Sequence, residues 1–305
     1  MSRAGSLAAD GFAPTDPVRQ ARKTQRFRWL RTMPFIIRIC ALILLGFVLV
    51  ALAAPVLAPV DPADQDLLGR LQPPVGFGGS WDHPLGTDQL GRDVLSRTLY
   101  GARVSLGVGL AGLVIGVTLG VLCGLIAGVR PGLVDDGLMF LVDVQLALPF
   151  IVIALIAIAL FGSTLTVLII VMGFAGWESY ARLTRGMVLG TRKSQYVLAA
   201  EALGASSTRI ISRHIMPNVI APVIVLATFL LTGLILLEST LSFLGIGVQP
   251  PTPSWGSMIG EGRDYLNTAW WMAVIPGVAI MLATMSISLL GDWLRDVLDP
   301  TVRSR

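Results

Sequence analysis

The sequence has little charge and almost no histidine. Lysine, arginine, aspartate and glutamate make up only 14% of the 305 residues, whereas about 25% is usual in soluble domains. Hydrophobic residues make up 54% of the chain, a share that a soluble protein of this length could not shield from water. The composition therefore excludes a cytosolic enzyme, a disordered regulator and a collagen-like chain, and it predicts a membrane protein.

Cysteine and the common catalytic motifs are also scarce. The two cysteines, Cys40 and Cys123, lie inside apolar runs and are interpreted as small buried hydrophobic side chains rather than as a disulfide framework or a metal site. The chain has no Gly-x-x-x-x-Gly-Lys-Ser/Thr phosphate loop, no His-Glu-x-x-His, no Gly-x-Ser-x-Gly and no Cys-x-x-Cys. We therefore expect no catalytic, cofactor or metal site in this chain. A membrane enzyme with dispersed catalytic residues stays an alternative.

Six apolar stretches are expected to cross a bilayer as helices, since a hydrocarbon core about 30 Å thick needs roughly 20 residues. They lie at 39–58, 104–128, 138–161, 165–181, 219–244 and 270–290. The fourth is the least apolar, because it turns polar around Glu178. A cleaved signal peptide is the alternative for the first stretch, but about 38 residues with eight basic side chains precede it, too many for such a leader. The predicted fold class is an all-α polytopic membrane protein with six transmembrane helices.

Basic residues are distributed unevenly between the segments outside these stretches. Eighteen of the 23 lie on the side of the 1–38 and 291–305 tails and the 182–218 loop, and five lie on the side of the 59–103 and 245–269 loops. Because basic loops stay in the cytoplasm, both termini are expected on the cytoplasmic side. The net charge of +4 is then a signal of topology and does not indicate nucleic-acid binding.

Four of the polar residues within the predicted spans are candidates for a substrate pathway. They are Asp143, Gln145, Glu238 and Ser239. An ionisable group at membrane depth must face protein or water, which makes each a functional candidate by default. The alternatives are an interhelical hydrogen bond for Asp143, and for Glu238 either a pin for the outer loops or a place at the membrane interface. Both histidines lie outside the spans, so a proton relay has little support.

A ladder of glycines runs along the second predicted span. Gly112, Gly116, Gly120, Gly124 and Gly128 recur at every fourth position and share one helical face. Such a face lets the backbone of another helix approach closely. The ladder therefore predicts tight helix packing along the whole span.

The 182–218 loop carries most of the internal charge. A helix is predicted over 194–203, with a break at Gly204. A second helix is expected to begin at the serine pair that follows and to end at Pro217. Two short helices joined by a glycine suit docking onto a soluble partner, and a solvated connector held by lipid head groups is the alternative.

The same loop carries a family signature. Residues 196–204 and 215–218 resemble the Glu-Ala-Ala, three residues, Gly, then Leu-Pro pattern of permease subunits in bacterial ABC importers. Two positions depart from it: Leu198 stands where the pattern usually has a glutamate, and Met216 where a leucine is common. Leu198 suggests a more apolar contact, or one whose acidic partner is the nearby Glu201.

Further blocks narrow the resemblance. Residues 83–97, 238–245, 253–256 and 291–300 look like successive parts of the second, C-type, permease of the dipeptide/oligopeptide (nickel) transport family. The resemblance covers 83–300 and implies the type I ABC importer permease fold. It also implies a function: moving di- or oligopeptides, or a related small solute, into the cytoplasm, driven by ATP hydrolysis on separate subunits.

The resemblance further implies residue roles, partners and location. Coupling to the ATPase subunit would involve Leu198, Ala199, Ala200, Glu201, Gly204, Ile215 and Pro217. The outer loops or gate would involve Gly86, Asp88, Arg92, Asp93 and Trp255. The implied partners are a homologous second permease, two ATP-binding subunits that hold ATP and Mg²⁺, an extracytoplasmic substrate-binding protein and membrane lipid. The implied location is the bacterial cytoplasmic (inner) membrane. An ion-coupled secondary transporter is the alternative, but it predicts inverted repeats and clustered membrane carboxylates, and neither is seen.

Overall fold

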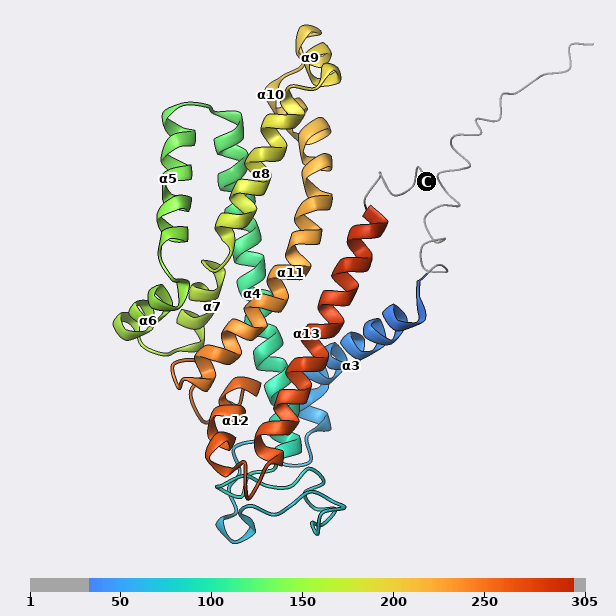
Figure 1. Ribbon diagram of the computed structural model, residues 1–305, viewed down its shortest axis with the longest axis vertical. Coiled ribbons are helices and arrows are strands. Elements are labelled where there is room, and N and C mark those ends of the chain that lie inside the picture. Colours follow the sequence, from blue (N-terminus) through green and yellow to red (C-terminus); the bar gives the residue numbers. More distant parts are fainter. Residues whose placement is uncertain (1–32, 299–305) are drawn as a thin grey trace, which may run out of the picture.

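The computed structural model describes residues 33–298, and within that range the chain is helical and contains no strand (Figure 1). The helices are α3 (Phe35–Leu57), α4 (Val94–Val129), α5 (Leu133–Ala147), α6 (Phe150–Phe161), α7 (Leu165–Gly173), α8 (Trp177–Arg192), α9 (Gln195–Ala202), α10 (Ser207–Ile210), α11 (Met216–Phe243), α12 (Trp255–Gly262) and α13 (Trp271–Leu298). The predicted all-α class is confirmed. Helices α9 and α10 project at one end of the bundle, and α12 lies with the outer loops at the opposite end (Figure 1).

The expected number of six membrane-spanning helices is not confirmed by the lengths and composition of the helices. Four helical stretches of the described chain are long and apolar enough to cross a membrane. They are Phe35–Leu57, Val94–Val129, Ser207–Phe243 and Trp271–Leu298. A fifth is reached only if α5 and α6 count together as one span. The expected single span at 138–161 is thus two helices, and the stretch at 165–181 is divided between α7 and α8.

Local backbone chemistry explains both breaks. Helices α5 and α6 are bent by 92° at a link made of Leu148 and Pro149. Proline has no N–H to continue the helical ladder, and it pushes the preceding residue into extended backbone, as seen for Leu148 with φ −105° and ψ 135°. Between α7 and α8 the break falls at Gly176, whose φ of +90° suits glycine far better than any other residue.

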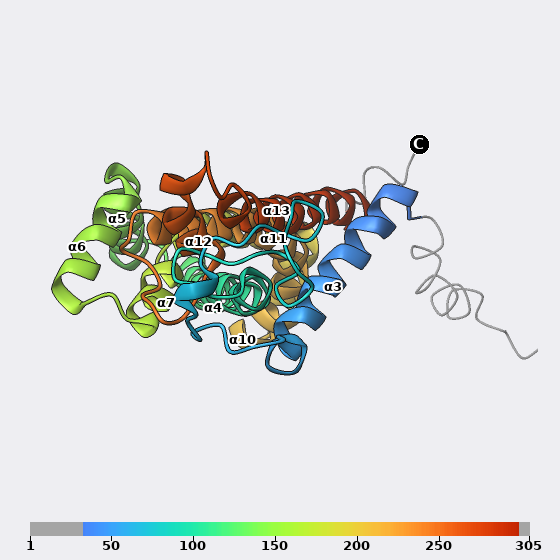
Figure 2. The same ribbon diagram turned by 90° about the horizontal axis from the view of Figure 1, so that it is seen from below.

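Helix α4 is the centre of the bundle (Figure 2). It has 36 residues and begins at Val94, well before the apolar stretch that starts at residue 104. The carboxylate of Asp93 accepts a hydrogen bond from the backbone N–H of Ser96 at 2.7 Å and so caps the helix. Helices α3, α7, α8 and α11 all pack against α4, which makes it the common wall of the described chain.

The glycine ladder explains how closely α4 meets its neighbours. A Cβ atom added at any of its five glycines would lie within 3.1 Å of an atom of α7 or α8. At Gly112, Gly120, Gly124 and Gly128 this distance is below 3.0 Å, which real Cβ atoms essentially never show, and at Gly116 it is 3.1 Å, which is tight. The predicted tight packing is confirmed, and α7 and α8 are the partners.

The chain beyond Gly204 forms a longer helix than expected. From Ser207 the helix continues through a π-helical turn, Ile211–Ile215, into α11, which ends at Phe243. The prediction that Pro217 ends a short helix is wrong. The wide π turn interrupts the ordinary hydrogen-bond ladder just before Pro217, which therefore sits in a fresh first turn, where a missing N–H costs little.

Candidate functional site

A buried ion network joins the loop before α4 to the helices α4 and α12. Arg92 Nε lies 2.6 Å and Arg97 Nη1 2.7 Å from Oδ2 of Asp88. The two guanidinium groups also reach Oε2 of Glu261 on α12, at 2.5 and 3.0 Å. Asp88, Arg92 and Arg97 are buried. The network fixes the loop before α4, the first turn of α4 and α12 as one unit.

The neighbouring loop residues complete this outer unit. Besides capping α4, Asp93 lies 3.0 Å from Nδ1 of His83. Gly86 has φ +80°, and a Cβ there would lie 2.9 Å from the indole nitrogen of Trp271, which donates to the carbonyl of Thr87 at 3.0 Å. The loop before α4 is therefore folded against α4, α12 and α13.

Removing one cation from this network gives a first testable prediction. We expect Arg97→Met to destabilise the protein by about 3–5 kcal/mol, because it leaves the buried carboxylate of Asp88 and that of Glu261 short of a partner. The apparent melting temperature of the purified protein in detergent would fall by roughly 10 °C. Arg263→Met is the control, since Arg263 makes an exposed pair with Asp264 at 3.5 Å and a cation–π contact 5.7 Å from the Phe243 ring centroid, each worth about 1 kcal/mol or less. Equal melting temperatures for the two variants would contradict the assignment.

Trp255 and Glu238 lie side by side in the core of this outer unit. Trp255 is fully buried, and its indole nitrogen donates to the carbonyl of Thr98 at 3.0 Å. Its backbone N–H donates to Oγ of Ser105 at 3.2 Å. Through these bonds α12 is attached to α4.

The Glu238 carboxylate is enclosed by serines. It is 0% exposed, and Ser242 Oγ donates to its Oε1 at 2.7 Å. The hydroxyls of Ser239, Ser105 and Ser254 also lie against it. This geometry favours the alternative in which Glu238 pins the outer segments together. A substrate-pathway role for Glu238 and Ser239 stays a prediction.

A second polar seam runs between the antiparallel helices α5 and α8. The guanidinium of Arg185 donates to both oxygens of Asp135, at 2.5 and 2.7 Å. Further along, Arg182 Nη2 lies 2.5 Å from Oδ1 of Asp143. Asp143 thus makes the interhelical contact that was the alternative to a pathway role. Its side chain and that of Arg182 are nevertheless 62% and 53% exposed.

Gln145 is the last polar residue of this seam and lies next to the α5–α6 bend and the α7–α8 break. Its amide nitrogen donates to the carbonyl of Phe174 at 2.6 Å and to Oε2 of Glu178 at 3.1 Å. Its amide oxygen accepts a hydrogen bond from the indole of Trp177. Glu178 was visible in the sequence only as the point where the fourth stretch turns polar, and it was not among the predicted site residues.

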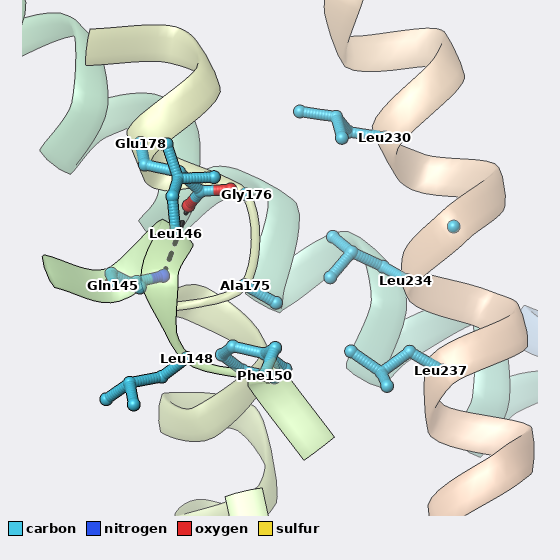
Figure 3. Close-up of a pocket in the computed structure, with 11 residues that line it drawn as sticks. Gln145, Leu146, Leu148, Phe150, Ala175, Gly176, Glu178, Leu230, Leu234 and Leu237 are labelled. Atoms are coloured by element: carbon cyan, nitrogen blue, oxygen red, sulfur yellow. Dashed lines mark hydrogen bonds between the residues drawn. The ribbon is translucent and has the colours of Figure 1, made fainter. Parts of the chain in front are cut away.

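A cavity of about 300 Å³ opens beside this group (Figure 3). It is lined by Gln145, Leu146, Leu148, Phe150, Ala175, Gly176, Glu178, Leu230, Gly233, Leu234 and Leu237. Figure 3 shows the α11 leucines pointing across toward the wall that carries Gln145 and Glu178. Of the predicted pathway residues, only Gln145 lines this cavity; Asp143, Glu238 and Ser239 do not.

The opposite end of the bundle carries the predicted coupling residues. Leu198, Ala199 and Glu201 are exposed on α9, while Val197 is buried and holds this helix against α8, α10 and the π turn. Ala200 is half-buried and Pro217 is exposed. Ile215 is buried, so in this structure it supports the loop from within.

Gly204 closes α9 through backbone geometry. Its φ is +81°, its N–H donates to the carbonyl of Glu201, and the next N–H, of Ala205, donates to the carbonyl of Ala200. These two bonds form a Schellman motif, which favours glycine at the left-handed position. A Cβ at Gly204 would meet no atom within 4 Å, so the requirement comes from the backbone and not from crowding within this chain.

Comparison with known proteins identifies the fold and the sequence pattern. Residues 120–304 match the family described as binding-protein-dependent transport system inner membrane component. The chain belongs to this family. Residues 38–74 also match the N-terminal TM domain of oligopeptide transport permease C, which confirms the resemblance to a C-type permease. The chain is therefore a multi-pass inner-membrane permease component of an ABC transport system.

Individual relatives agree with this assignment. The chain is 42% identical over 264 residues to the di/tripeptide transport system permease protein DppC of Pseudomonas aeruginosa, covering 86% of this chain and 87% of that protein. It is 43% identical over 255 residues to the dipeptide transport system permease protein DppC of Escherichia coli K12, covering 83% and 85%. A chain of the MetNI methionine ABC transporter in an inward-facing conformation shares the fold, with a TM-score of 0.51 at 18% identity, covering 68% of this permease and 96% of that chain.

Proposed function

We propose that this permease moves di- or oligopeptides into the cytoplasm as one of two permease subunits of an ABC importer. The observation that carries the proposal is the identity of 42–43% to di/tripeptide and dipeptide permeases over more than four fifths of both chains. The chain has no phosphate loop of its own, so ATP and Mg²⁺ would be bound and used by separate subunits. The chain itself would be no enzyme and would hold no cofactor or metal.

The proposed partners attach at opposite ends of the bundle. Of the two ATP-binding subunits, one would dock on the exposed side of α9 of this permease, where Leu198, Ala199 and Leu203 present apolar surface at the basic end of the bundle. That end, with both termini, would lie in the cytoplasm. A homologous second permease would complete the pathway within the lipid bilayer, and an extracytoplasmic substrate-binding protein would deliver the peptide to the outer unit.

The proposed cycle needs two conformations and no chemistry in this chain. ATP binding would close the ATPase subunits and move α9, and the permease pair would change from inward-open to outward-open and accept the peptide. Hydrolysis would reset it. A nucleotide can drive this change only because the two conformations bind it differently.

Reconstitution tests the proposal directly. The chain, produced with its second permease, ATPase subunits and substrate-binding protein, is inserted into liposomes with a labelled dipeptide outside. We expect ATP-dependent uptake that a sodium or proton gradient cannot replace, and stoichiometric ATPase subunits on purification through a tag on this chain. Uptake driven by an ion gradient without ATP would instead support the secondary-transporter alternative, and uptake of methionine but no peptide would overturn the substrate class.

A further inference from the structure

The α5–α8 seam shows which side of this permease faces away from lipid. Asp143 and Arg182 form a charged pair more than half exposed, and Asp143 lies within the apolar region that the bent α5–α6 pair contributes to the membrane. Exposed charge at membrane depth is costly in lipid, so it must face water or protein. Along the same two helices the next polar contact is that of Gln145 with Glu178, which opens into the cavity.

The cavity has one charged group, Glu178, one side-chain amide, Gln145, and otherwise apolar walls. Glu178 is the single charged residue among the described residues that line it, and it makes no ion pair with a lysine or arginine within residues 33–298. Arg182, one turn further along α8, is near enough to attract the Glu178 carboxylate, but it makes its direct ion pair with Asp143. A carboxylate that faces an apolar cavity without a direct ion pair offers a binding site for a cation from outside the chain.

We propose that Glu178 binds the terminal ammonium group of the peptide as it passes through the permease, with the first side chain of the peptide against Leu230, Leu234 and Leu237. This inference rests on the proposed peptide cargo. About 300 Å³ is at the lower end for ligand cavities, so the cavity holds one end of a peptide and leaves the remainder in the pathway. The amide of Gln145 orients the Glu178 carboxylate by donating to Oε2.

Two variants separate charge from structure. Glu178→Gln removes the charge but keeps an oxygen that can accept the Gln145 hydrogen bond, so the seam is preserved. Glu178→Asp keeps the charge on a shorter side chain. Both are reconstituted as the complete importer and compared with the wild type. The substrates are two lysine-free dipeptides that differ only in the α-amino group, which is present in one and replaced by hydrogen in the other.

The expected result is selective for the ammonium group. Each peptide is supplied at a concentration that saturates the substrate-binding protein, measured beforehand. Glu178→Gln should lower transport of the amino peptide about tenfold, the size of one charge-assisted hydrogen bond, and lower that of the desamino peptide less than twofold. Glu178→Asp should restore most of the transport. Saturation-transfer NMR of the amino peptide on the permease–ATPase complex, without the binding protein, should show the same order of binding among the wild type, Glu178→Asp and Glu178→Gln. This measurement also applies if the substrate-binding protein does not bind the desamino peptide.

Other outcomes overturn the inference. An equal loss for both peptides, or an Asp variant no better than the Gln variant, would show that Glu178 only fixes α5 to α8. No loss for either peptide would show that the carboxylate plays no part in transport. A wild-type importer that moves neither peptide would mean that the proposed function itself fails, which is a different result from a wild type that transports and a variant that does not discriminate.

Discussion

Gly124→Leu is expected to prevent the bundle from folding. The Cβ of any other residue at this position would lie 2.8 Å from Cβ of Thr184 and nearer still to the backbone carbonyl of Ala181 on α8. Neither atom can move without separating α8 from α4 along the glycine ladder, and overpacking of this kind against backbone exceeds the usual cost of about 1–3 kcal/mol. We expect little monodisperse protein after solubilisation, and rapid proteolysis of what remains.

A control on the same helix isolates the cause. A Cβ at Gly107 would meet no atom within 4 Å, and this residue is exposed. Gly107→Leu should therefore leave both yield and melting temperature near those of the wild type, since leucine also favours the helix more than glycine does. If Gly124→Leu and Gly107→Leu behaved alike, close α4–α8 packing would not be what the ladder provides.

Gly204→Trp is expected to insert normally into the membrane but to uncouple transport from ATP hydrolysis. A tryptophan here opposes the left-handed backbone that closes α9, and its size also obstructs the surface proposed to dock on the ATPase subunit. In reconstituted importer we expect peptide uptake to be lost and the ATPase to stop responding to the loaded substrate-binding protein.

Two further variants distinguish the backbone effect from the docking effect. Gly204→Asn tolerates the left-handed conformation and should keep most of the coupling. Ala199→Trp leaves the backbone of α9 regular and adds bulk only on its exposed side, so it should uncouple as Gly204→Trp does. Normal uptake and normal ATPase stimulation in both tryptophan variants would refute the docking assignment.

Much of the helical architecture could be predicted from local patterns. The apolar stretches 39–58, 219–244 and 270–290 each fall within, or within a residue of, one long helix, because uninterrupted apolar runs determine such helices. The bend between α5 and α6 was missed, since hydropathy averages over Pro149 and treats the two helices as one run. The break at Gly176 was missed for the same reason, although both residues were visible as helix breakers.

The site residues divide along similar lines. Asp88 and Arg92 lie in one motif and are close in the chain, so a local pattern could select them. Glu261 lies 164 residues from Arg97 and joins the network only through the packing of α12, which a single sequence does not reveal. Glu178 contacts Gln145, 33 residues away, and shares its cavity with the leucines of α11. These residues come together only when the chain folds, so the sequence does not reveal the cavity.

The continuous helix from Ser207 to Phe243, made of α10, the π turn and α11, can act as a lever. Its 37 residues extend about 55 Å, from the segment beside α9 at one end to Glu238 and its serines near the other. A tilt of about 3° around its middle would shift the two ends by about 1.5 Å in opposite directions. A push at the inner end would thus reach α12 with its direction reversed, and a passage that narrows on one side of the membrane would widen on the other.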